Sequence, residues 1–541
     1  MALDMTAEQK ELGKANFLEV TDGLTRRGFM KSMAAAAGVV PVAAATYFGY
    51  ESIKGKPVKA ALIGCGDEGG VLLGEHNPDY IQFVAACDIR PYNKTRILNG
   101  DPKVPLRKGF AKVYGADYAK NIGEKHFYTS WEEMLEKEKD LEAVVIALPL
   151  HLHAPVAIAC MKAGKHVLCE KLMARTITQC KDMIRTAEDP KVDRILTIGH
   201  QRHYSMLYAH AVEVMNSGVL GDVKHIRALW HRNFTWPWSP EAGAPELAAG
   251  VQQPQIRDGW YQPVFKMDYD ALKDSVKKYG YDDVEQLIRW RLNRATGGGL
   301  MAELGSHQLD ACSIFLGKVH PIAVTGYGGR LFFGPGKNDR DIDDHIFLTF
   351  EFPGKNYAND KNDVVVVSYS SISTNGFEAY GECVMGSRGT LVVEAEQSAM
   401  LYMERNPTAK GGGAPRSTNV SVTTQASNKP ALESSSTWGP AAPTAAAGSS
   451  GGGAATAAAG PISRGYKEEM EDFAYCIRRW NDGMSSDRRI TRCPGKVAMA
   501  DAIIAFTANL AMKRKQRIEF QEGWFDPKNF DSVPEKDGEL A

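Results

Sequence analysis

The sequence has no excess of charge of one sign. Among its 541 residues, 64 are basic and 65 are acidic, which gives a formal net charge of −1 at pH 7. Proteins that bind nucleic acid usually have a basic patch or stripe, and this balance offers no sign of one. The composition therefore favours small-molecule chemistry, and we expect no nucleic-acid partner.

Paired cysteine motifs are missing as well. The nine cysteines include no C-x-x-C pair, show no spacing typical of metal ligands, and are odd in number, which argues against a full disulfide framework. Most lie within apolar runs, where a free cysteine behaves as a small hydrophobic residue. We therefore expect them in the core.

The amino-terminal region lacks a strongly apolar run. Residues 32–50 are uncharged, but they are rich in alanine and interrupted by glycine and proline, whereas a membrane anchor needs about 20 strongly apolar residues. The preceding Thr25–Lys31 reads T-R-R-G-F-M-K and resembles a twin-arginine export signal. We expect residues 1–50 to be a signal peptide of a periplasmic or cell-envelope protein, with no stable membrane span after cleavage. A short basic turn before an alanine-rich core helix is the alternative.

A glycine-rich loop follows the first apolar strand. Val58–Ile63 is a continuous apolar run, as in a parallel strand buried on both faces, and it leads into Gly64-Cys65-Gly66-Asp67-Glu68-Gly69. The glycines of G-x-G-x-x-G allow a tight turn, close approach of the backbone to a pyrophosphate, and packing of the next helix. The loop predicts a dinucleotide site at Gly64, Gly66 and Gly69.

The second strand ends at an acidic residue. Phe83–Cys87 is followed by Asp88, close to the offset of about 20 residues at which a carboxylate binds the ribose hydroxyls. This carboxylate would repel a 2′-phosphate, so NAD is favoured over NADP. Arg90 could instead hold that phosphate, so NADP remains the less favoured alternative.

Two more apolar strands complete the pattern of a doubly wound parallel sheet. Ala143–Leu148 ends at Pro149, and His166–Cys169 ends at Glu170 and Lys171. Ligands of such sheets bind beyond the carboxyl ends of the strands. The predicted cofactor-binding residues are therefore Gly64, Gly66, Gly69, Asp88, Arg90, Pro149, His153 and Glu170.

Three segments resemble the Gfo/Idh/MocA family of oxidoreductases. They are A-L-I-G-C-G-D-E-G, then A-V-V-I-A-L-P-L-H-L-H-A-P-V-A-I-A-C-M-K-A-G-K-H-V-L-C-E-K, and G-G-G-L-M-A-E-L-G-S-H-Q-L-D. The resemblance implies a Rossmann domain followed by an α/β domain with an open, mostly antiparallel sheet. In the family this sheet binds substrate and often mediates oligomers, so a homo-oligomer, a dimer or tetramer, is expected.

The resemblance also implies site residues. The catalytic lysine of the family motif E-K-P corresponds to Lys171, although Leu172 replaces the proline. An acidic residue and a histidine four positions apart correspond to Glu303, where aspartate is usual, and His307. Arg202, in G-H-Q-R-H-Y-S, matches a basic residue commonly found near the substrate.

The third segment is predicted to be helical from Leu300 to Leu316. Glu303, His307 and Asp310 would then share one face, as a substrate site, as satisfied core polar groups, or as a metal site without a convincing third ligand. We predict the substrate site and no metal. Trp236, within W-H-R-N-F-T-W-P-W, suits a sugar ring, and a core position is the alternative.

The predicted reaction is hydride transfer between nicotinamide and a sugar-like or polyol-like alcohol. Lys171 would accept or relay the hydroxyl proton, His307 would hydrogen-bond the reacting oxygen or share the proton relay, and Glu303 would orient the lysine. An NAD-dependent glycoside hydrolase that uses transient oxidation is the alternative, and a non-enzymatic sugar- or nucleotide-binding protein is the second.

The expected organisation has four parts after the signal. Residues 57–200 form the NAD-binding Rossmann domain, and residues 201–407 form the substrate and oligomerisation domain. Residues 408–461, dominated by Gly, Ala, Ser, Thr and Pro, cannot bury a core and are predicted to be a low-complexity insertion. Residues 462–541 would supply helices that complete the second domain.

Overall fold

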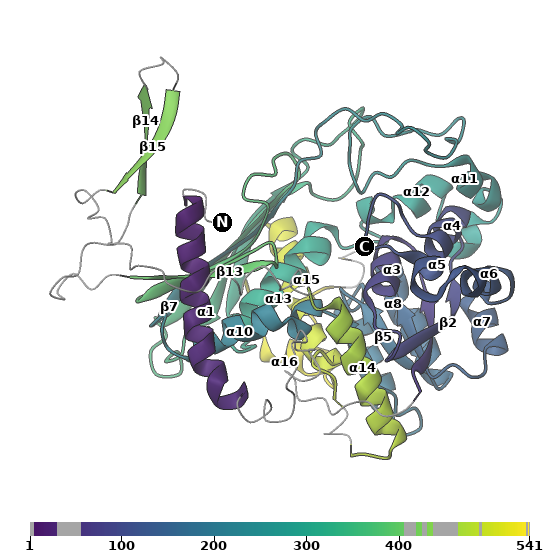
Figure 1. Cartoon of the computed structure of the whole chain (residues 1–541), viewed down its shortest axis with the longest axis horizontal. Helices are drawn as coiled ribbons and strands as arrows, with labels where there is room; N and C mark the ends of the chain where they lie inside the picture. The colour runs from purple at the N-terminus through teal and green to yellow at the C-terminus, as the bar shows by residue number, and fades with distance from the viewer. Residues whose placement is uncertain are drawn as a thin grey trace, which may run out of the picture.

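A computed structural model describes residues 5–29, 56–404, 418–424, 430–436, 464–485, 490–536 and 539. Two α/β domains lie side by side, each built on its own sheet, with the amino-terminal domain in blue and the second sheet in green (Figure 1). The predicted fold class, a Rossmann domain followed by a domain with a mostly antiparallel sheet, is confirmed.

The first domain has a six-stranded parallel sheet in the order β3-β2-β1-β4-β5-β6. Both faces of the sheet are covered, because alternate residues of the central strands enter two different apolar clusters. Ala61 and Ile63 of β1 pack on one side, and Ala60 and Leu62 pack on the other. The strands are β1 (Val58–Ile63), β2 (Ile81–Cys87), β3 (Phe127–Tyr128), β4 (Ala143–Ile146), β5 (His166–Glu170) and β6 (Leu196–Gly199).

Helices connect these strands on both faces of the sheet. They are α3 (Asp67–Glu75), α4 (Pro91–Asn99), α5 (Gly109–Tyr114), α6 (Ala116–Lys125), α7 (Trp131–Lys137), α8 (His153–Lys162) and α9 (Ile177–Glu188), with a 3-10 turn at Leu150–Leu152.

The second domain has an eight-stranded sheet in the order β13-β12-β11-β7-β10-β9-β8-β16. Neighbouring strands are antiparallel except β7 and β10, which are parallel. The strands are β7 (Val223–His231), β8 (Ala323–Gly329), β9 (His345–Pro353), β10 (Val364–Ile372), β11 (Tyr380–Gly386), β12 (Gly389–Glu394), β13 (Ser398–Met403) and β16 (Ile518–Glu519). Helices α10 (Met206–Asn216) and α13 (Ser306–Phe315) pack on its inner face.

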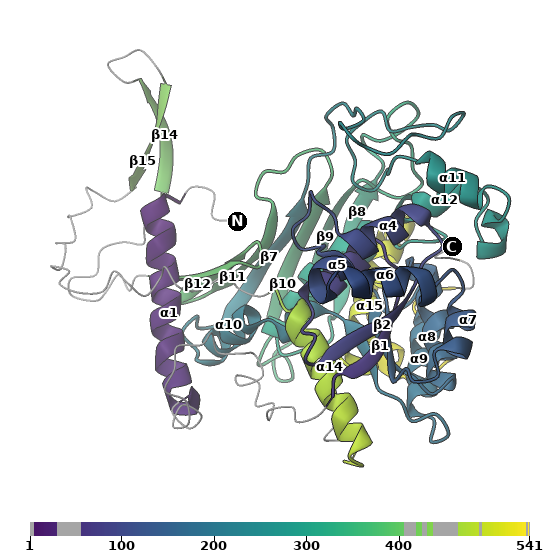
Figure 2. The same ribbon diagram turned by 45° about the vertical axis from the view of Figure 1, so that its right-hand side comes forward.

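A long connection from β7 towards α13 extends over the Rossmann domain, and we call residues 232–293 the cap. The cap contains α11 (Lys266–Leu272), a 3-10 turn at Val276–Tyr279, α12 (Val284–Ile288) and a second turn at Trp290–Leu292. It has its own apolar cluster, against which Ile89 packs, and α11 contacts α4. Figure 2 shows α11 and α12 beside the Rossmann helices.

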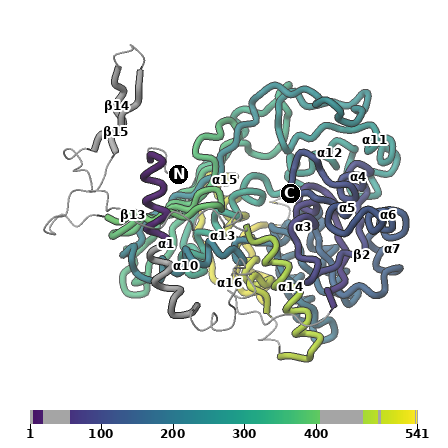
Figure 3. The backbone as a smooth tube through the Cα atoms, in the orientation of Figure 1, coloured from purple at the N-terminus to yellow at the C-terminus, as the bar shows by residue number. Residues whose placement is uncertain are grey.

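The two long helices near the carboxy terminus pack against different parts of the protein. α14 (Tyr466–Asn481) packs on the Rossmann sheet and against α3, as the chain trace also shows (Figure 3). α15 (Gly495–Arg514) packs against β8, α9 and α13, and α16 (Glu522–Phe525) follows it. Residues 462–541 were expected to supply helices that complete the second domain. α15 fits this expectation, whereas α14 packs on the first domain.

α15 is also the helix in the described part of the chain with the length and apolar composition to cross a membrane. Of its apolar window, 78% is buried inside the protein, as in a core helix.

Two further segments lie against or beyond the second sheet. α1 (Ala7–Phe29) contacts β13 and α10, and it includes the first five residues of the twin-arginine-like sequence. Residues 30–55, with the rest of the predicted signal peptide, lie outside the described residues. Within the predicted low-complexity insertion, β14 (Thr418–Thr424) and β15 (Pro430–Ser436) pair as an antiparallel hairpin.

Candidate active site

The glycine loop joins β1 to the amino terminus of α3. Gly64 has a φ of +94°, and a Cβ there would lie 2.3 Å from the Ala147 carbonyl oxygen, while a Cβ on Gly69 would lie 2.1 Å from the Gly64 oxygen. Packing thus demands glycine at both positions. At Gly66 the nearest atom, Nδ2 of Asn93, would be 3.8 Å away, so the protein itself does not require glycine there.

The open space beside Gly66 fits a pyrophosphate. Gly66 precedes the first turn of α3, and no side chain caps this helix. The first N–H groups of a helix have no intrahelical partner and, with the helix dipole, favour an anion. The residues present therefore fit the phosphates of a dinucleotide.

Asp88, at the end of β2, lies beside this loop. Its carboxylate accepts hydrogen bonds from the backbone N–H of Cys65 and of Arg90, both at 2.8 Å, and from Nδ2 of Asn93 at 3.0 Å. Burial raises the pKa of Asp88, and these donors oppose the rise. A carboxylate has about four lone-pair sites, so acceptor capacity remains for a ribose hydroxyl.

Arg90, the alternative ligand of a 2′-phosphate, is paired within the protein. Its Nε donates to Oδ2 of Asp268 at 2.9 Å, and Asp268 is fully buried in α11 of the cap. The structure thus joins Arg90 to a residue 178 positions away that sequence reasoning did not single out.

The ends of β4 and β5 hold the other predicted cofactor residues. Pro149 precedes the 3-10 turn after β4, and His153 is buried, with ring nitrogens 2.8 Å from the carbonyl oxygens of Leu148 and Leu172. Because both nitrogens contact main-chain groups, His153 braces these two strand-end loops. The contact of His153 with the cofactor stays a prediction beside this bracing role.

Glu170 belongs to a group of buried acids at the same edge. Glu68 in the glycine loop, Glu170 and Glu469 of α14 each have a carboxylate oxygen without a hydrogen-bond partner among the described residues. Burial raises the pKa of all three, and in Glu170 and Glu469 the neighbouring acids add to the rise. The orphaned oxygens of Glu68 and Glu170 suit hydroxyl groups of a cofactor. Glu469 was missed because α14 is distant in the sequence.

Lys171 reaches from the end of β5 to the second domain. Its ammonium donates to the main-chain carbonyl of Glu303 at 3.0 Å, and the peptide bond from Lys171 to Leu172 is cis. The lysine therefore points into the site although Leu172 replaces the family's proline.

Glu303 lies in a π-helical turn, Met301–Gly305, immediately before α13. Its Oε2 accepts from Nε of Arg291 at 2.9 Å. Burial opposes ionisation, but the charges of Arg291 and Lys171 outweigh it and hold the pKa of Glu303 below its usual value. Glu303 is thus a carboxylate at neutral pH.

His307 is in the first turn of α13 and is 8% exposed. Its ring lies 5.6 Å from that of Trp230 at the end of β7. Burial, followed by the positive charges of Lys171 and Arg202, lowers the pKa of His307 well below its usual value. The imidazole is therefore neutral and can donate one hydrogen bond and accept another.

Arg202 lies behind the site and is 1% exposed. Its guanidinium donates to Glu382 of β11 at 2.8 Å, to Glu396 at 2.9 Å and to Oε1 of Gln308 at 3.2 Å. These contacts tie the second sheet to α13. These partners and its burial favour a structural role for Arg202, and its substrate contact stays a prediction.

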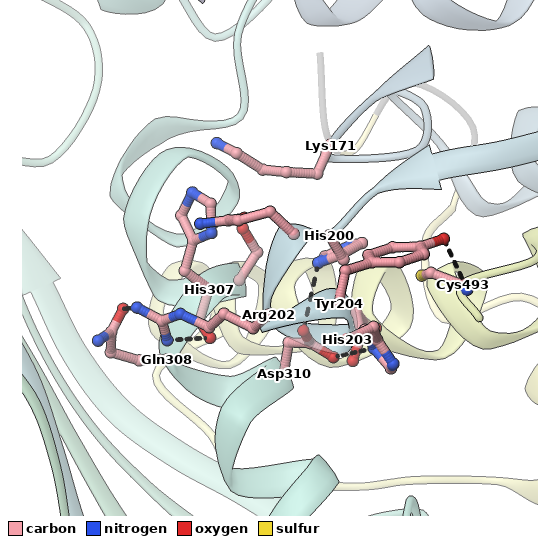
Figure 4. A network of polar contacts seen from close by, with 12 residues as sticks. Lys171, His200, Arg202, His203, Tyr204, His307, Gln308, Asp310 and Cys493 are labelled. Carbon is pink, nitrogen blue, oxygen red and sulfur yellow. Dashed lines mark hydrogen bonds and ion pairs between the residues drawn. The ribbon is translucent and has the colours of Figure 1, made fainter. Parts of the chain in front are cut away.

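Asp310 belongs to a second buried network on the far side of His200. Figure 4 shows Lys171 and His307 on one side of His200, with Asp310 and His203 on the other. Asp310 Oδ1 lies 2.8 Å from Nε2 of His203 and 3.0 Å from Nζ of Lys318. Burial lowers the pKa of His200 to about 3 despite the nearby Asp310. Asp310 is therefore separated from the predicted substrate site.

This network includes the three side chains in the described chain that could jointly bind a metal ion. Single ligand atoms of His200, Asp310 and Asp501 lie within 4.8 Å of one another. The ammonium of Lys318, however, lies 3.0 Å from both carboxylates and supplies the positive charge they need. The Glu303 and His307 pair, by contrast, is not part of this group.

Two further candidate side chains, Trp236 and Arg232, lie at the start of the cap. Trp236 is 66% exposed and so remains a candidate for an open sugar-binding surface. Arg232 was missed, although it lies in the W-H-R-N-F segment that sequence analysis marked as suited to sugars. Burial lowers its pKa to about 10, Glu303 opposes this shift, and Nη2 has no partner among the described residues. Such an orphaned donor suits a substrate hydroxyl.

Curated relatives resemble parts of the chain. A levoglucosan dehydrogenase from Pseudarthrobacter phenanthrenivorans is 29% identical over 27% of this chain and 36% of its own length. A glycosyl hydrolase family 109 protein from Stenotrophomonas maltophilia is 32% identical over 32% of this chain and 36% of its length, and an inositol 2-dehydrogenase from Salmonella paratyphi B is 30% identical over 35% and 49%. The chain thus spans about a third to a half of each of these three relatives.

Solved structures share the fold. An inositol dehydrogenase homologue from Azotobacter vinelandii, complexed with NADH and myo-inositol, has a TM-score of 0.53 at 14% identity and covers 86% of this chain and 98% of its own. An oxidoreductase domain protein from Kribbella flavida has a TM-score of 0.52 at 16% identity, covering 86% and 100%.

Sequence models of known families match both domains. One describes an oxidoreductase family with an NAD-binding Rossmann fold and matches residues 58–200, and the other describes the GFO/IDH/MocA C-terminal domain and matches residues 276–392. The two models match in this order and together cover just under half of the chain, so both domains are similar to those of the Gfo/Idh/MocA family of oxidoreductases.

Proposed function

We propose that the chain is an NAD-dependent oxidoreductase that transfers hydride between a CH–OH group of a sugar or polyol and nicotinamide. The observation that carries the proposal is the hydrogen bond from Nζ of Lys171 to the main-chain carbonyl of Glu303, because it joins an ammonium at the nucleotide-binding edge to the turn that carries Glu303 and leads into the helix of His307. The relatives named as dehydrogenases of levoglucosan and inositol support this substrate class.

The side chains divide the work of the reaction. NAD, when bound, supplies the hydride acceptor. Lys171 exchanges a proton with the reacting oxygen at Nζ, and the neutral His307 hydrogen-bonds the same oxygen. Glu303, held by Arg291, keeps the lysine in place, and the unpaired Nη2 of Arg232 binds a further hydroxyl.

A direct assay tests this proposal. Purified protein with NAD is offered a panel of sugars and polyols, and NADH formation is followed by absorbance. Substrate-dependent reduction, lost in Lys171→Ala, is the expected result. Protein that binds NAD but neither reduces it nor converts any sugar would be a binding protein, and the proposal would fail.

The relatives named as glycosyl hydrolase family 109 proteins favour one alternative, a hydrolase that uses transient oxidation. Net NADH formation distinguishes the two, since the hydrolase regenerates its NAD in each cycle. Release of free sugar from an aryl glycoside without accumulation of NADH would favour the hydrolase.

We also propose that the protein is exported by the twin-arginine route to the periplasm or cell envelope. The T-R-R-G-F-M-K segment and the uncharged stretch after it support this location. A fusion of residues 1–50 to a reporter should reach the periplasm, and replacement of both arginines by lysine should block it. A reporter that remains cytoplasmic would contradict the proposal.

A homo-oligomer is the last part of the proposal. Tyr327, Phe347, Val366 and Met385 lie on one face of the second sheet, across four strands, and are 54%, 44%, 37% and 37% exposed. A row of exposed apolar side chains on a sheet favours association. Light scattering should give the mass of a dimer or tetramer, and Phe347→Glu should shift it towards the monomer.

A further inference from the structure

The ion pair between Arg90 and Asp268 lies where NAD and NADP differ. Arg90 follows β2 by three residues, beside the Asp88 carboxylate that faces the ribose position of a Rossmann site. NADP adds a phosphate there, with a charge of about −1.5 to −2, and such phosphates need a positive partner. Arg90 is a natural partner by position, so its side-chain contacts decide whether it is available.

Asp268 holds Arg90 through two separate contacts. Its Oδ2 accepts from Nε of Arg90 at 2.9 Å, and its Oδ1 accepts from the backbone N–H of Tyr92 at 2.9 Å. Asp268 is 0% exposed, whereas the Arg90 side chain is 17% exposed. If Arg90 turned towards a phosphate, the buried Oδ2 would lose its charged partner, which is a costly change.

The rest of the cap keeps Asp268 in place. The rings of Tyr92 and Phe265 lie 4.6 Å apart, directly before α11, and Ile89 packs against the cap's apolar cluster. Tyr281 of the cap meets His151 edge to face at 5.4 Å. Apolar contacts on both sides of α11 therefore fix the position of Asp268 relative to β2.

The local charge also opposes a phosphate. Asp88 and Asp268 bring two carboxylates to this corner, and Arg90 brings one guanidinium. A 2′-phosphate would add to an existing excess of negative charge, whereas a ribose hydroxyl of NAD only needs an acceptor. Neither family model covers residues 201–275, which include α11, so Asp268 lies outside the matched regions, whereas Arg90 lies within the first.

We propose that Asp268 makes the site selective for NAD over NADP by holding Arg90 away from the 2′-phosphate position. The inference rests on the nucleotide site of the proposed function and identifies a cap residue as its specificity determinant. Asp88 contributes repulsion, and Asp268 withholds the guanidinium of Arg90, which would offset it.

Binding measurements without any sugar substrate test the proposal. Dissociation constants for NAD and NADP are measured by calorimetry on wild-type protein, Asp268→Asn, Arg90→Gln and the double variant. Wild type should bind NAD at least 30-fold more tightly than NADP. Asp268→Asn keeps an acceptor for Tyr92 but releases the guanidinium, so NADP binding should tighten at least tenfold with little change for NAD, and Arg90→Gln should remove that gain.

Asp270→Asn is the matched control, because Asp270 lies on the same helix, is half exposed and pairs with Lys266 instead. It should leave both constants unchanged. Wild-type protein with equal affinity for both nucleotides would overturn the proposal. So would a folded Asp268→Asn with an unchanged ratio, or an Arg90→Gln that alone weakens NADP binding tenfold more than NAD binding.

The Arg90→Gln result decides the matter even if Asp268→Asn does not fold. Failure to bind either nucleotide would overturn the proposed function together with this inference. Normal NAD selectivity without oxidation of any sugar would overturn the proposed function alone.

Discussion

The ammonium of Lys171 donates to the main-chain carbonyl of Glu303 at 3.0 Å and so joins the two domains at the site. Lys171 is fixed by the end of β5, whereas Glu303 is fixed by the π-helical turn before α13. A shift between the domains would therefore move the lysine relative to the acid. This makes the interface between the domains part of the proposed catalytic geometry.

Lys171→Ala should lower kcat for sugar oxidation by about 10²- to 10⁴-fold, the usual contribution of a positioned acid or base. NAD affinity should change less than threefold, because Lys171 contacts Glu303 rather than the glycine loop. Steady-state kinetics and NAD titration provide the measurements. Lys162→Ala, an exposed lysine on α8, is the control. Activity of Lys171→Ala within a few-fold of wild type would contradict the assigned role.

Arg202→Met should destabilise the fold by about 3–5 kcal/mol, since it leaves buried Glu382 and Glu396 without their shared partner. Burial already raises the pKa of Glu382 to about 7 against the effect of Arg202, so this carboxyl would become more readily protonated. Urea unfolding at pH 7 measures the loss. A large rise in KM with unchanged stability would instead restore the substrate role predicted from the sequence.

Acid should destabilise the protein through histidines that are buried in the neutral form. Burial lowers the pKa of His76 and His151 to about 4 and that of His200 to about 3. As pH falls below the unfolded value of about 6.5, the unfolded chain binds protons that the folded chain does not, so stability falls until the folded pKa is reached.

His200→Gln isolates one such group. Asp310 raises the pKa of His200, while burial and the charges of His203, Lys318 and Lys171 lower it. Between pH 6.5 and 4.5 the variant should lose about 2 kcal/mol less stability than wild type, measured by urea unfolding at both values. His225→Gln, a partly exposed histidine of β7, should show the wild-type loss. Equal losses in His200→Gln and wild type would show that His200 is not kept neutral by the fold.

Sequence reasoning found the residues whose positions follow from local pattern. Parallel strands are apolar runs followed by loops, so β1 was located at Val58–Ile63 and the cofactor edge at Gly64 and Asp88. Lys171, Glu303 and His307 came from motifs, and in the structure the lysine donates to the main-chain carbonyl of Glu303. These features depend on contacts within a strand, a turn or a helix.

The features that were missed depend on contacts distant in sequence. The cap contributes Asp268, α14 contributes Glu469, and the segment directly after β7 contributes Arg232. No periodicity in the sequence indicates how these segments pack. Arg202 was predicted to contact substrate because it matches a basic residue of the family, and Asp310 because helical spacing puts it on one face with Glu303 and His307. Arg202 pairs with Glu382 and Glu396, which lie 180 and 194 positions away, and Asp310 pairs with Lys318, 8 positions away, so spacing could not identify these partners.

Gly66 offers a test of the cofactor site that separates binding from folding. A Cβ at Gly66 would meet nothing closer than 3.8 Å, so Gly66→Ala should fold with a Tm close to that of wild type. The added methyl group would occupy the space beside the first turn of α3 where the pyrophosphate must approach, so NAD affinity should fall at least tenfold.

Gly69→Ala provides the contrast. Its Cβ would lie 2.1 Å from the Gly64 carbonyl oxygen, so this variant should lose stability as well as NAD binding. Thermal melts with and without NAD measure both effects, since a ligand that binds only the folded state raises Tm. Wild type should be stabilised by NAD, and at the same NAD concentration the rise in Tm should be clearly smaller in Gly66→Ala. An undiminished shift in Gly66→Ala would mean that the dinucleotide does not lie across this loop.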